Sequence, residues 1–347
     1  MTDHAEPKTV PATMRALELR SYDGADSLAL VERPVPRPGA GEVLVRVAAT
    51  PINPSDLMFV RGLYGQKKRL PVVPGFEASG EVIASGSGVM ARYLSGKRVA
   101  CAAPFDGDGT WAEFMVTPAA LCIPLGRRTE LEGAASMIVN PFTAWALLER
   151  ARHLRAKAVV QTAAASALGR MIVRLAAARR VAVVNVVRRR EQVELLKREG
   201  AEHVLDSTAA DFDEHLLELS ARLGATAAFD AVAGELTGRI LRAMPAGSRA
   251  VVYGALSQEG CLLDPRSLIF EGKAVEGFWL SEWLRAKNVL GKFLVARRVE
   301  VLLRSELKTE VRARLPLEAA AEGLRSYERE MTGGKVLLVP GLLRPTP

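Results

Sequence analysis

Short runs of alternating apolar and polar residues, separated by glycine and proline, fill the first third of the chain. In GEVLVRVAAT (41–50), Val and Leu alternate with polar or small residues, which is the period of a half-buried β-strand. The segments GEVIASGSGV (80–89) and GKRVACAAP (96–104) indicate further short strands between turns. The pattern predicts an antiparallel, barrel-like β domain over residues 1–128.

The pattern changes near residue 129, where helical segments begin to alternate with short apolar strands. VAVVNVV (181–187) is a continuous apolar run, as expected of a parallel strand that is covered on both faces. Other predicted strands are AVVQTAAA (158–165) and KAVEGFWL (273–280). This alternation predicts an α/β domain with a doubly wound parallel sheet over residues 129–283. Residues 284–347 are expected to return to the first domain, leaving a ligand cleft between the two.

Composition excludes several classes of protein. At 347 residues the chain is long for one hydrophobic core, and it contains no 18-residue apolar run, so we expect no membrane span. The N-terminal segment MTDHAEPKTVPATMR lacks the apolar core of a secretory signal. The net charge of +8 is scattered rather than gathered in a stripe, so nucleic-acid binding is not expected. Three widely separated cysteines suit a reducing compartment and predict a cytoplasmic protein.

A candidate phosphate-binding turn follows the first predicted strand of the α/β domain. QTAAASALGRM (161–171) leads from that strand into a helix, and small residues there let the backbone approach a pyrophosphate. Ser166, Ala167 and Leu168 precede a single glycine, Gly169, so the glycine pattern is thin. The alternative is an alanine-rich turn that only packs closely.

The end of the next strand bears on the choice of cofactor. NAD-selective sites carry an acidic residue about 20 residues after the glycine turn. Here VAVVNVV is followed by Arg188, Arg189 and Arg190, and arginine pairs well with the 2′-phosphate of NADPH. Side chains two apart on a strand share a face, so we expect Arg188 and Arg190 to reach that phosphate and Arg189 to point away. The alternative is a solvated helix start.

The sequence shows no ligand set for a metal. None of the four histidines is spaced with cysteine for tetrahedral zinc, so no metal site is predicted. Cys101 and Cys122 lie in apolar segments and are interpreted as buried structural thiols.

Several motifs together resemble the zinc-free branch of the medium-chain dehydrogenase/reductase superfamily, which includes quinone oxidoreductases and enoyl thioester reductases. The resemblance covers nearly the whole chain, and NVVRRR and GFWLSEW are most similar to the mitochondrial 2-enoyl thioester reductases. It implies a GroES-like β-barrel substrate domain, a Rossmann nucleotide-binding domain, NADPH as cofactor, and a homodimer joined along KAVEGFWL. The segments that carry it are NPSDLMFVRGLYG (53–65), PVVPGFEASGEVIASG (71–86), MIVNPFTAWALL (137–148), VVYGAL (251–256) and LIFEGKAVEGFWLSEW (268–283).

The resemblance also implies roles for individual residues. Tyr64, 11 residues after Asn53, matches the tyrosine that is considered catalytic in the enoyl reductases, where a neutral hydroxyl suits a developing enolate. The alternative is a tyrosine that only packs against its loop. Asn53, Asn140 and Trp279 are expected to line the substrate cleft. The residues expected to meet the cofactor are Ser166, Ala167, Leu168, Gly169, Arg188, Arg190, Tyr253, Gly254 and Phe278.

Two departures from family patterns lead to further expectations. Ala167 occupies a position where the family usually has glycine, so we expect a slightly altered phosphate turn. Gly75-Phe76-Glu77 stands where zinc alcohol dehydrogenases have a Gly-His-Glu metal motif, so zinc-assisted chemistry is not expected.

These observations predict an NADPH-dependent reductase of activated C=C bonds that acts on a small-molecule acceptor, a 2-enoyl thioester or an enone. One alternative keeps the fold and reduces quinones. Another is a non-catalytic NADPH-binding protein that contacts RNA or a membrane through its basic surface. The acyl chain length and its carrier are left open.

Overall fold

The computed structural model describes residues 10–342. Residues 1–9, which include most of the segment considered for a secretory signal, and residues 343–347 lie outside the described part. The chain forms two compact units: unit 1 contains residues 1–139 and 309–347, and unit 2 contains residues 140–308.

Unit 2 therefore begins and ends later in the chain than the expected range of 129–283. The later end has a physical cause, because the segment after residue 279 is tied to the first helix of unit 2. The Glu149 carboxylate accepts a hydrogen bond from Trp283 Nε1 at 3.1 Å and pairs with Lys287 Nζ at 2.9 Å. This hydrogen bond and this ion pair join segments that are far apart in sequence, and local sequence patterns do not predict such contacts.

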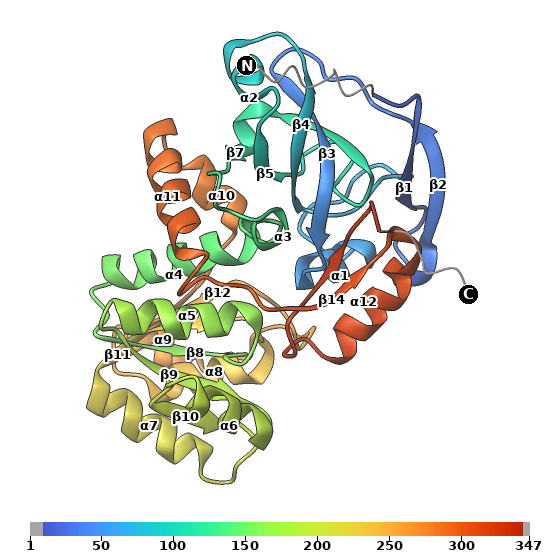
Figure 1. The fold of residues 1–347 in the computed structure, drawn as a ribbon. Coiled ribbons are helices and arrows are strands. Elements are labelled where there is room, and N and C mark those ends of the chain that lie inside the picture. The colour runs from blue at the N-terminus through green and yellow to red at the C-terminus, as the bar shows by residue number, and fades with distance from the viewer. Residues whose placement is uncertain (1–9, 343–347) are drawn as a thin grey trace. The chain divides into compact units, whose positions relative to one another are not determined.

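Unit 1 is mostly β-structure, as the alternating pattern predicted (Figure 1). Its strands are β1 (Thr13–Leu19), β2 (Leu28–Pro34), β3 (Glu42–Pro51), β4 (Glu77–Ser85), β5 (Arg98–Ala102), β6 (Phe114–Pro118), β7 (Cys122–Pro124), β14 (Val311–Leu315) and β15 (Lys335–Leu338). Its helices are α1 (Pro54–Val60), α2 (Val89–Leu94), α3 (Leu131–Ala134) and α12 (Ala320–Arg329), with 3-10 turns at Gly24–Ser27, Ala119–Leu121 and Leu317–Ala319.

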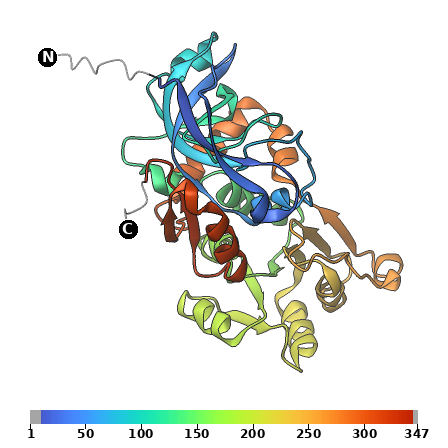
Figure 2. The same ribbon diagram turned by 90° about the vertical axis from the view of Figure 1, so that its right-hand side faces the viewer.

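Seven strands of unit 1 form one sheet in the order β14-β15-β3-β4-β5-β7, with β6 pairing on β3. All neighbours are antiparallel except β14 and β15. Figure 2 shows the blue and cyan strands of this unit as a strongly curved sheet. The long central strand β3 pairs with β15 through Pro51 with Leu337 and Thr50 with Leu338, which are 286 and 288 positions apart, so the C-terminal return completes the β unit.

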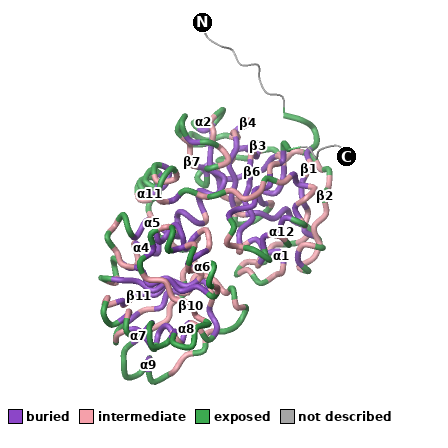
Figure 3. The backbone as a smooth tube through the Cα atoms, turned by 60° about the horizontal axis from the view of Figure 1, so that its bottom comes forward, coloured by how far each residue is buried: buried purple, intermediate pink, exposed green. Residues whose placement is uncertain are grey.

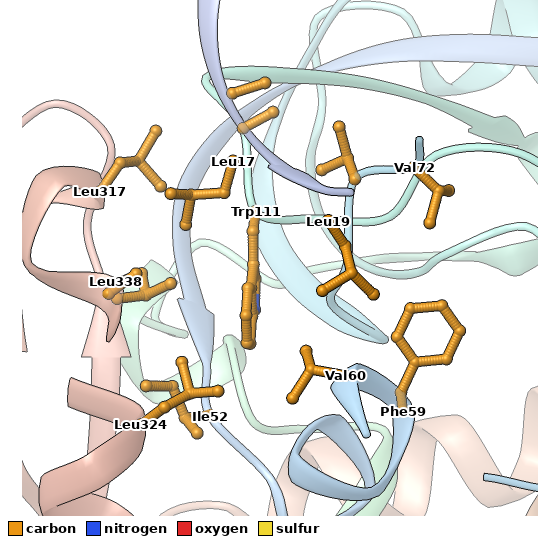
Figure 4. Close-up of a cluster of buried hydrophobic side chains, with 14 of the residues drawn as sticks. Leu17, Leu19, Ile52, Phe59, Val60, Val72, Trp111, Leu317, Leu324 and Leu338 are labelled. Carbon is orange, nitrogen blue, oxygen red and sulfur yellow. The ribbon is translucent and has the colours of Figure 1, made fainter. Parts of the chain in front are cut away.

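A fully buried tryptophan, Trp111, stands at the centre of the main core of unit 1. Its ring lies among side chains of β1, β15 and α1, with Leu19 on one side and Leu338 on the other (Figure 4). Gly75 has a φ of +99°, and a Cβ there would lie 2.5 Å from the Trp111 ring. Only glycine permits this approach, so the chain before β4 is held against the core.

Unit 2 alternates helices with strands, also as predicted. Its helices are α4 (Val139–His153), α5 (Ala167–Ala178), α6 (Arg190–Arg198), α7 (Phe212–Leu223), α8 (Gly234–Ala243), α9 (Pro265–Ile269), α10 (Leu280–Arg285) and α11 (Val289–Leu302). Its strands are β8 (Ala158–Gln161), β9 (Ala182–Val187), β10 (His203–Asp206), β11 (Ala225–Asp230), β12 (Arg249–Val252) and β13 (Ala274–Gly277).

The six strands of unit 2 form an entirely parallel sheet in the order β10-β9-β8-β11-β12-β13. Counted from the first strand of the unit this is 3-2-1-4-5-6, the order of a dinucleotide-binding Rossmann fold. The central strands are buried on both faces (Figure 3), which explains their continuous apolar sequence. The order reverses between β8 and β11, where such sheets bind ligands beyond the carboxyl ends of the strands.

None of the helices within residues 10–342 is long and apolar enough to cross a membrane.

Candidate functional site

The segment that carries Tyr64 is shaped by its own local sequence. Pro54 is the first residue of α1, and the Asp56 carboxylate accepts a hydrogen bond from the Asn53 N–H at 2.7 Å, as in a capping box. The helix ends where Gly62 adopts a φ of +68°. The N–H groups of Gly62 and Leu63 donate to the carbonyls of Phe59 and Met58, both at 2.9 Å, which is a Schellman ending.

Tyr64 follows this ending by two residues and is half-buried. Its ring centroid lies 4.7 Å from that of Phe76, which in turn packs edge-on against Phe59 at 5.7 Å. Phe76 thus supports Tyr64 at the position where zinc alcohol dehydrogenases carry a metal-binding histidine. Among residues 10–342, no group of three or more His, Cys, Asp or Glu side chains is placed to hold a metal ion.

Behind the loop lies a buried polar network of Lys335, Asn53, Glu77 and Asp56, all at most 1% exposed. The Lys335 ammonium donates to Asn53 Oδ1 and to the Ile52 carbonyl, the latter at 3.3 Å. Asn53 Nδ2 donates to Glu77 Oε1 at 3.0 Å. Because both ends of the Asn53 amide are occupied inside the protein, the structure disagrees with the expectation that Asn53 lines a substrate cleft.

Burial shifts the acid–base properties of this network. Desolvation raises the pKa of Asp56 to about 7, and the nearby Lys335 opposes this only in part. Desolvation likewise raises the pKa of Glu77 and lowers the pKa of Lys335 to about 8. In each case loss of water disfavours the charged form, so Asp56 and Lys335 change charge near neutral pH.

In unit 2 the phosphate turn joins β8 to α5. Ser166 caps the helix by accepting a hydrogen bond from the Gly169 N–H at 3.1 Å, and a Cβ on Gly169 would lie 2.4 Å from the Ala164 carbonyl oxygen. Ala167 is the first residue of α5 and has no positive φ. The left-handed residue of the turn is Ala163, with a φ of +49°.

This turn has the features that a pyrophosphate needs. Within residues 10–342 the N–H groups of Ala167 and Leu168 have no acceptor, as is usual for the first turn of a helix. Free N–H groups at the positive end of a helix bind phosphate well. Leu168 and Gly169 are buried, so any contact with a phosphate is made by their backbone.

The arginines after β9 are arranged differently from the expectation of a continued strand. The strand ends at Val187, Arg189 is the N-cap of α6, and Arg190 is its first residue. The side chain of Arg189 pairs with Glu191 at 3.2 Å. Those of Arg188 and Arg190 are exposed and have no ion pair within residues 10–342. Two cations without an ion pair in the described residues thus lie beside the end of the strand. Alternation along a strand does not account for their placement, because the strand ends before Arg188 and the helix begins at Arg190.

The other candidate residues of unit 2 lie at several places in it. Tyr253 and Gly254 directly follow β12, and the buried Tyr253 hydroxyl has no partner in the described part of the chain. Burial, with the Asp230 charge adding to it, raises the pKa of this hydroxyl. A buried polar atom without a partner is typical of a position where a water or ligand belongs.

Phe278 and Trp279 follow β13 and are partly exposed, whereas Asn140, in the first turn of α4, is buried.

Sequence reasoning missed Asp230, Lys335 and Glu77. Asp230 ends β11, and its carboxylate accepts hydrogen bonds from the hydroxyls of Thr162 and Thr237 and from the N–H of Val232, which ties the ends of β8 and β11 together. A signal was present for Lys335, since it is a single cation at the start of the apolar strand GGKVLLVP.

Known protein families match parts of both units of this chain. The model of the alcohol dehydrogenase GroES-like domain matches residues 39–127, and that of the zinc-binding dehydrogenase matches residues 167–294. The mitochondrial enoyl-[acyl-carrier-protein] reductase of Arabidopsis thaliana is 31% identical over 79% of this chain and 74% of its own length.

Two solved structures are also similar to this chain. A Mesorhizobium loti protein described as an NADPH:quinone reductase is 36% identical, with a TM-score of 0.89 over 96% of this chain and 100% of that one. A mycobacterial protein solved in complex with NADPH is 28% identical, with a TM-score of 0.81 over 94% of this chain and 100% of that one.

A first prediction concerns Asp56. Its pKa is higher in the folded protein, about 7, than its ordinary value of 3.8, so this group stabilises the fold at low pH and that stability is lost as pH rises to about 7. The contribution of Asp56 makes the unfolding free energy of the wild type decrease between pH 4 and 7, with a slope of up to about 1.4 kcal/mol per pH unit. Asp56→Asn keeps an acceptor for the Asn53 N–H but no longer titrates, so this part of the slope should disappear. Urea unfolding at four pH values measures this. The exposed Asp106→Asn is the control, and an unchanged slope in Asp56→Asn would contradict the prediction.

A second prediction concerns Gly169. A methyl group at this position would lie 2.4 Å from a backbone oxygen of the turn, so the turn must move. Overpacking of this kind costs roughly 1–3 kcal/mol, and we expect Gly169→Ala to weaken dinucleotide binding about 10- to 100-fold. A fluorescence titration checks this against Gly260→Ala, where a Cβ meets nothing within 4 Å. Equal affinities in the two variants would show that the turn does not hold the cofactor.

Proposed function

This chain belongs to the medium-chain dehydrogenase/reductase superfamily of oxidoreductases, and on that basis we propose that it is an NADPH-dependent reductase of activated carbon–carbon double bonds. The proposed acceptor is a 2-enoyl thioester or an enone. The observation that carries this choice is the placement of Tyr64 by a capped helix, a Schellman ending and an aromatic support.

NADPH is the proposed cofactor, and its groups match features of unit 2. The N–H groups of Ala167 and Leu168 would hold the pyrophosphate, and the exposed Arg188 and Arg190 would pair with the 2′-phosphate. Tyr253 and Gly254 lie beyond the strand ends, where the nicotinamide half is expected in this fold. When bound, NADPH supplies the hydride. The mycobacterial relative solved with NADPH supports this assignment.

Tyr64 is the proposed catalytic residue. Addition of hydride to the β-carbon of an enoyl thioester moves the electrons of the C=C bond toward the carbonyl, and negative charge develops on the carbonyl oxygen. The Tyr64 hydroxyl would donate a hydrogen bond to that oxygen, or would help to protonate the α-carbon of the enolate, which completes the saturated product. A fixed donor aimed at developing charge lowers the barrier because it requires no reorganisation during the reaction. Phe76 in place of a histidine supports a mechanism without zinc.

Reduction of quinones is the alternative, and one observation favours it: the Mesorhizobium loti relative is described as an NADPH:quinone reductase. A quinone accepts hydride without a proton donor placed at a thioester carbonyl. NADPH oxidation rates measured in parallel with crotonyl thioester, an enone and a quinone separate the two functions. We expect the thioester or the enone to be the best substrate.

We also propose a homodimer. Strand β13 is the edge of the parallel sheet, and edge strands invite pairing. A few residues before it, at the end of α9, the adjacent side chains of Ile269 and Phe270 are 69% and 80% exposed, and an exposed apolar pair close to a sheet edge fits an interface with a second copy.

The role of Tyr64 is tested by Tyr64→Phe, which removes one hydroxyl and almost no volume. Loss of a single oxyanion donor costs about 2.7–4 kcal/mol, or about 100- to 1,000-fold in the chemical step. We expect this loss in single-turnover rates on the best enoyl substrate, with NADPH affinity unchanged. Unaltered turnover would show that Tyr64 only packs, and would favour quinone reduction.

The cofactor choice is tested by the double variant Arg188→Ala with Arg190→Ala. Charge-assisted bonds contribute roughly 1.5–3 kcal/mol each, so the pair should favour NADPH over NADH by about two to four powers of ten. The double variant should lose this preference and most of the salt dependence of NADPH binding. Lys197→Ala with Arg198→Ala, at the other end of the same helix, removes equal charge as a control. Equal wild-type affinities for the two cofactors would reject the assignment.

The assembly is tested by light scattering at micromolar concentration, where we expect the mass of a dimer. Ile269→Asp with Phe270→Asp should shift the protein to a monomer, because two charges from each subunit would be buried at the interface. Leu217→Asp, at a residue of α7 that is 55% exposed, should leave the dimer intact. A wild-type monomer refutes the proposal.

A further inference from the structure

The ammonium of Lys335 is an unusual buried charge, and it lies outside the residues proposed above to contact substrate or cofactor. It is completely buried, and it sits 5.5 Å over the ring of Tyr327 while donating to Asn53 Oδ1 and the Ile52 carbonyl. Burying a cation is costly unless its partners compensate. An apolar residue would fill the same space without that cost, so the presence of the charge calls for a physical reason.

The Asn53 amide extends the network from this ammonium to a carboxylate. Its Oδ1 accepts from Lys335 and its Nδ2 donates to Glu77 Oε1. The other oxygen of Glu77 accepts hydrogen bonds from the N–H groups of Ile138 and Val139, at 2.8 and 2.9 Å. The cation thereby orders one amide and one carboxylate, and neither can turn without losing a partner.

Both chain segments that hold Tyr64 are joined directly to residues of this network. Asn53 is the N-cap of α1, which ends in the turn that leads to Tyr64. Glu77 directly follows Phe76, whose ring lies 4.7 Å from the ring of Tyr64. One ammonium therefore anchors both the start of the helix before Tyr64 and the aromatic residue on which Tyr64 packs.

We propose that Lys335 is a positioning residue for catalysis, which holds Tyr64 in its reactive place through Asn53 and Glu77. This inference rests on the proposed role of Tyr64. Lys335 touches neither substrate nor cofactor in this scheme, since it is fully buried. Lys335 therefore affects the rate only indirectly, through the position of Tyr64. The effect can still be large, because a misplacement of about 1 Å at a reacting group costs on the order of 100-fold in rate.

A purely structural role is the competing explanation, and the energetics of buried charges argue against it. Replacing a buried ionic network by apolar groups of similar volume is often neutral or stabilising, so such a network is weak evidence for stability. Its better-attested use is to select one arrangement of the chain over others. The arrangement selected here is the one that includes Tyr64.

The charge of Lys335 also makes the proposal testable by pH. Three titratable groups face the ammonium: Asp56 from α1, Glu77 from β4 and Tyr327 from α12. Burial lowers the pKa of Lys335 to about 8, so the wild-type chemical step should lose rate above about pH 8. Lys335→Arg keeps a cation at high pH, and it should keep its rate there. A structural role would move stability and leave the shape of this profile unchanged.

The decisive experiment is a double-mutant cycle of Lys335→Met and Tyr64→Phe on the full-length protein. We expect Lys335→Met to slow the single-turnover reduction of crotonyl thioester about 100-fold with NADPH affinity unchanged. In the Tyr64→Phe background the same change should cost less than about threefold, because there is no hydroxyl left to misplace. Lys273→Met is the matched control: Lys273 is a buried lysine of unit 2, paired with Glu271, and its loss should not change the rate in this way.

Hydrogen exchange separates failure of this inference from failure of the proposed function. If Lys335 positions the loop, amides of residues 56–64 exchange faster in Lys335→Met, whatever Tyr64 does chemically. No effect of Tyr64→Phe on rate would reject the catalytic role of Tyr64, and with it the catalytic part of this inference; faster exchange would then support positioning alone. Unchanged exchange, or equal costs of Lys335→Met in both backgrounds, overturns the inference. Should Lys335→Met not fold, Asn53→Ala, which breaks the same link, takes its place in the cycle.

Discussion

The hydrogen bond between the buried Lys335 ammonium and the Asn53 amide is the interaction on which the candidate site most depends. It joins the last strand of unit 1 to the residue that begins α1, and Asn53 passes the connection to Glu77 at the start of β4. In a low-dielectric interior, a charge that loses its partner costs about 3–5 kcal/mol. The three chain segments are therefore held in one arrangement. The apolar core around Trp111 supplies the dry surroundings that give this contact its strength.

The loop of Tyr64 combines two kinds of constraint. Local chemistry ends α1 with a glycine in the left-handed region and directs the chain toward Tyr64, while the Phe76 ring limits where the tyrosine can lie. A hydroxyl held in this manner suits a reaction in which charge develops at one oxygen, because the donor does not have to be reoriented.

Unit 2 presents cofactor-binding features at the carboxyl ends of its strands. The Ala163 backbone, the capping hydroxyl of Ser166 and the close approach of Gly169 shape the turn after β8. Asp230 holds the end of β11 against Thr162 of the same turn. Arg188 and Arg190 have no ion pair within the described residues, whereas Arg189, the helix cap between them, pairs with Glu191. These features fit NADPH, although the single glycine in the motif made the sequence signal thin.

The sequence by itself determined the elements and their class. Alternation of apolar residues specified the β unit, and continuous apolar runs specified the parallel sheet, because each depends on residues close together in the chain. The short helix α1 before Tyr64 was not predicted, although Pro54 at its start and Gly62 at its end are local signals. Only the tertiary structure decided that Asn53 is buried rather than facing a ligand, that Lys335 pairs with it across 282 positions, and that α10 and α11 belong to unit 2. Burial and long-range pairing depend on which distant segments pack together, and they set the local dielectric that shifts the pKa of Asp56 and of Lys335. No local pattern encodes those partners.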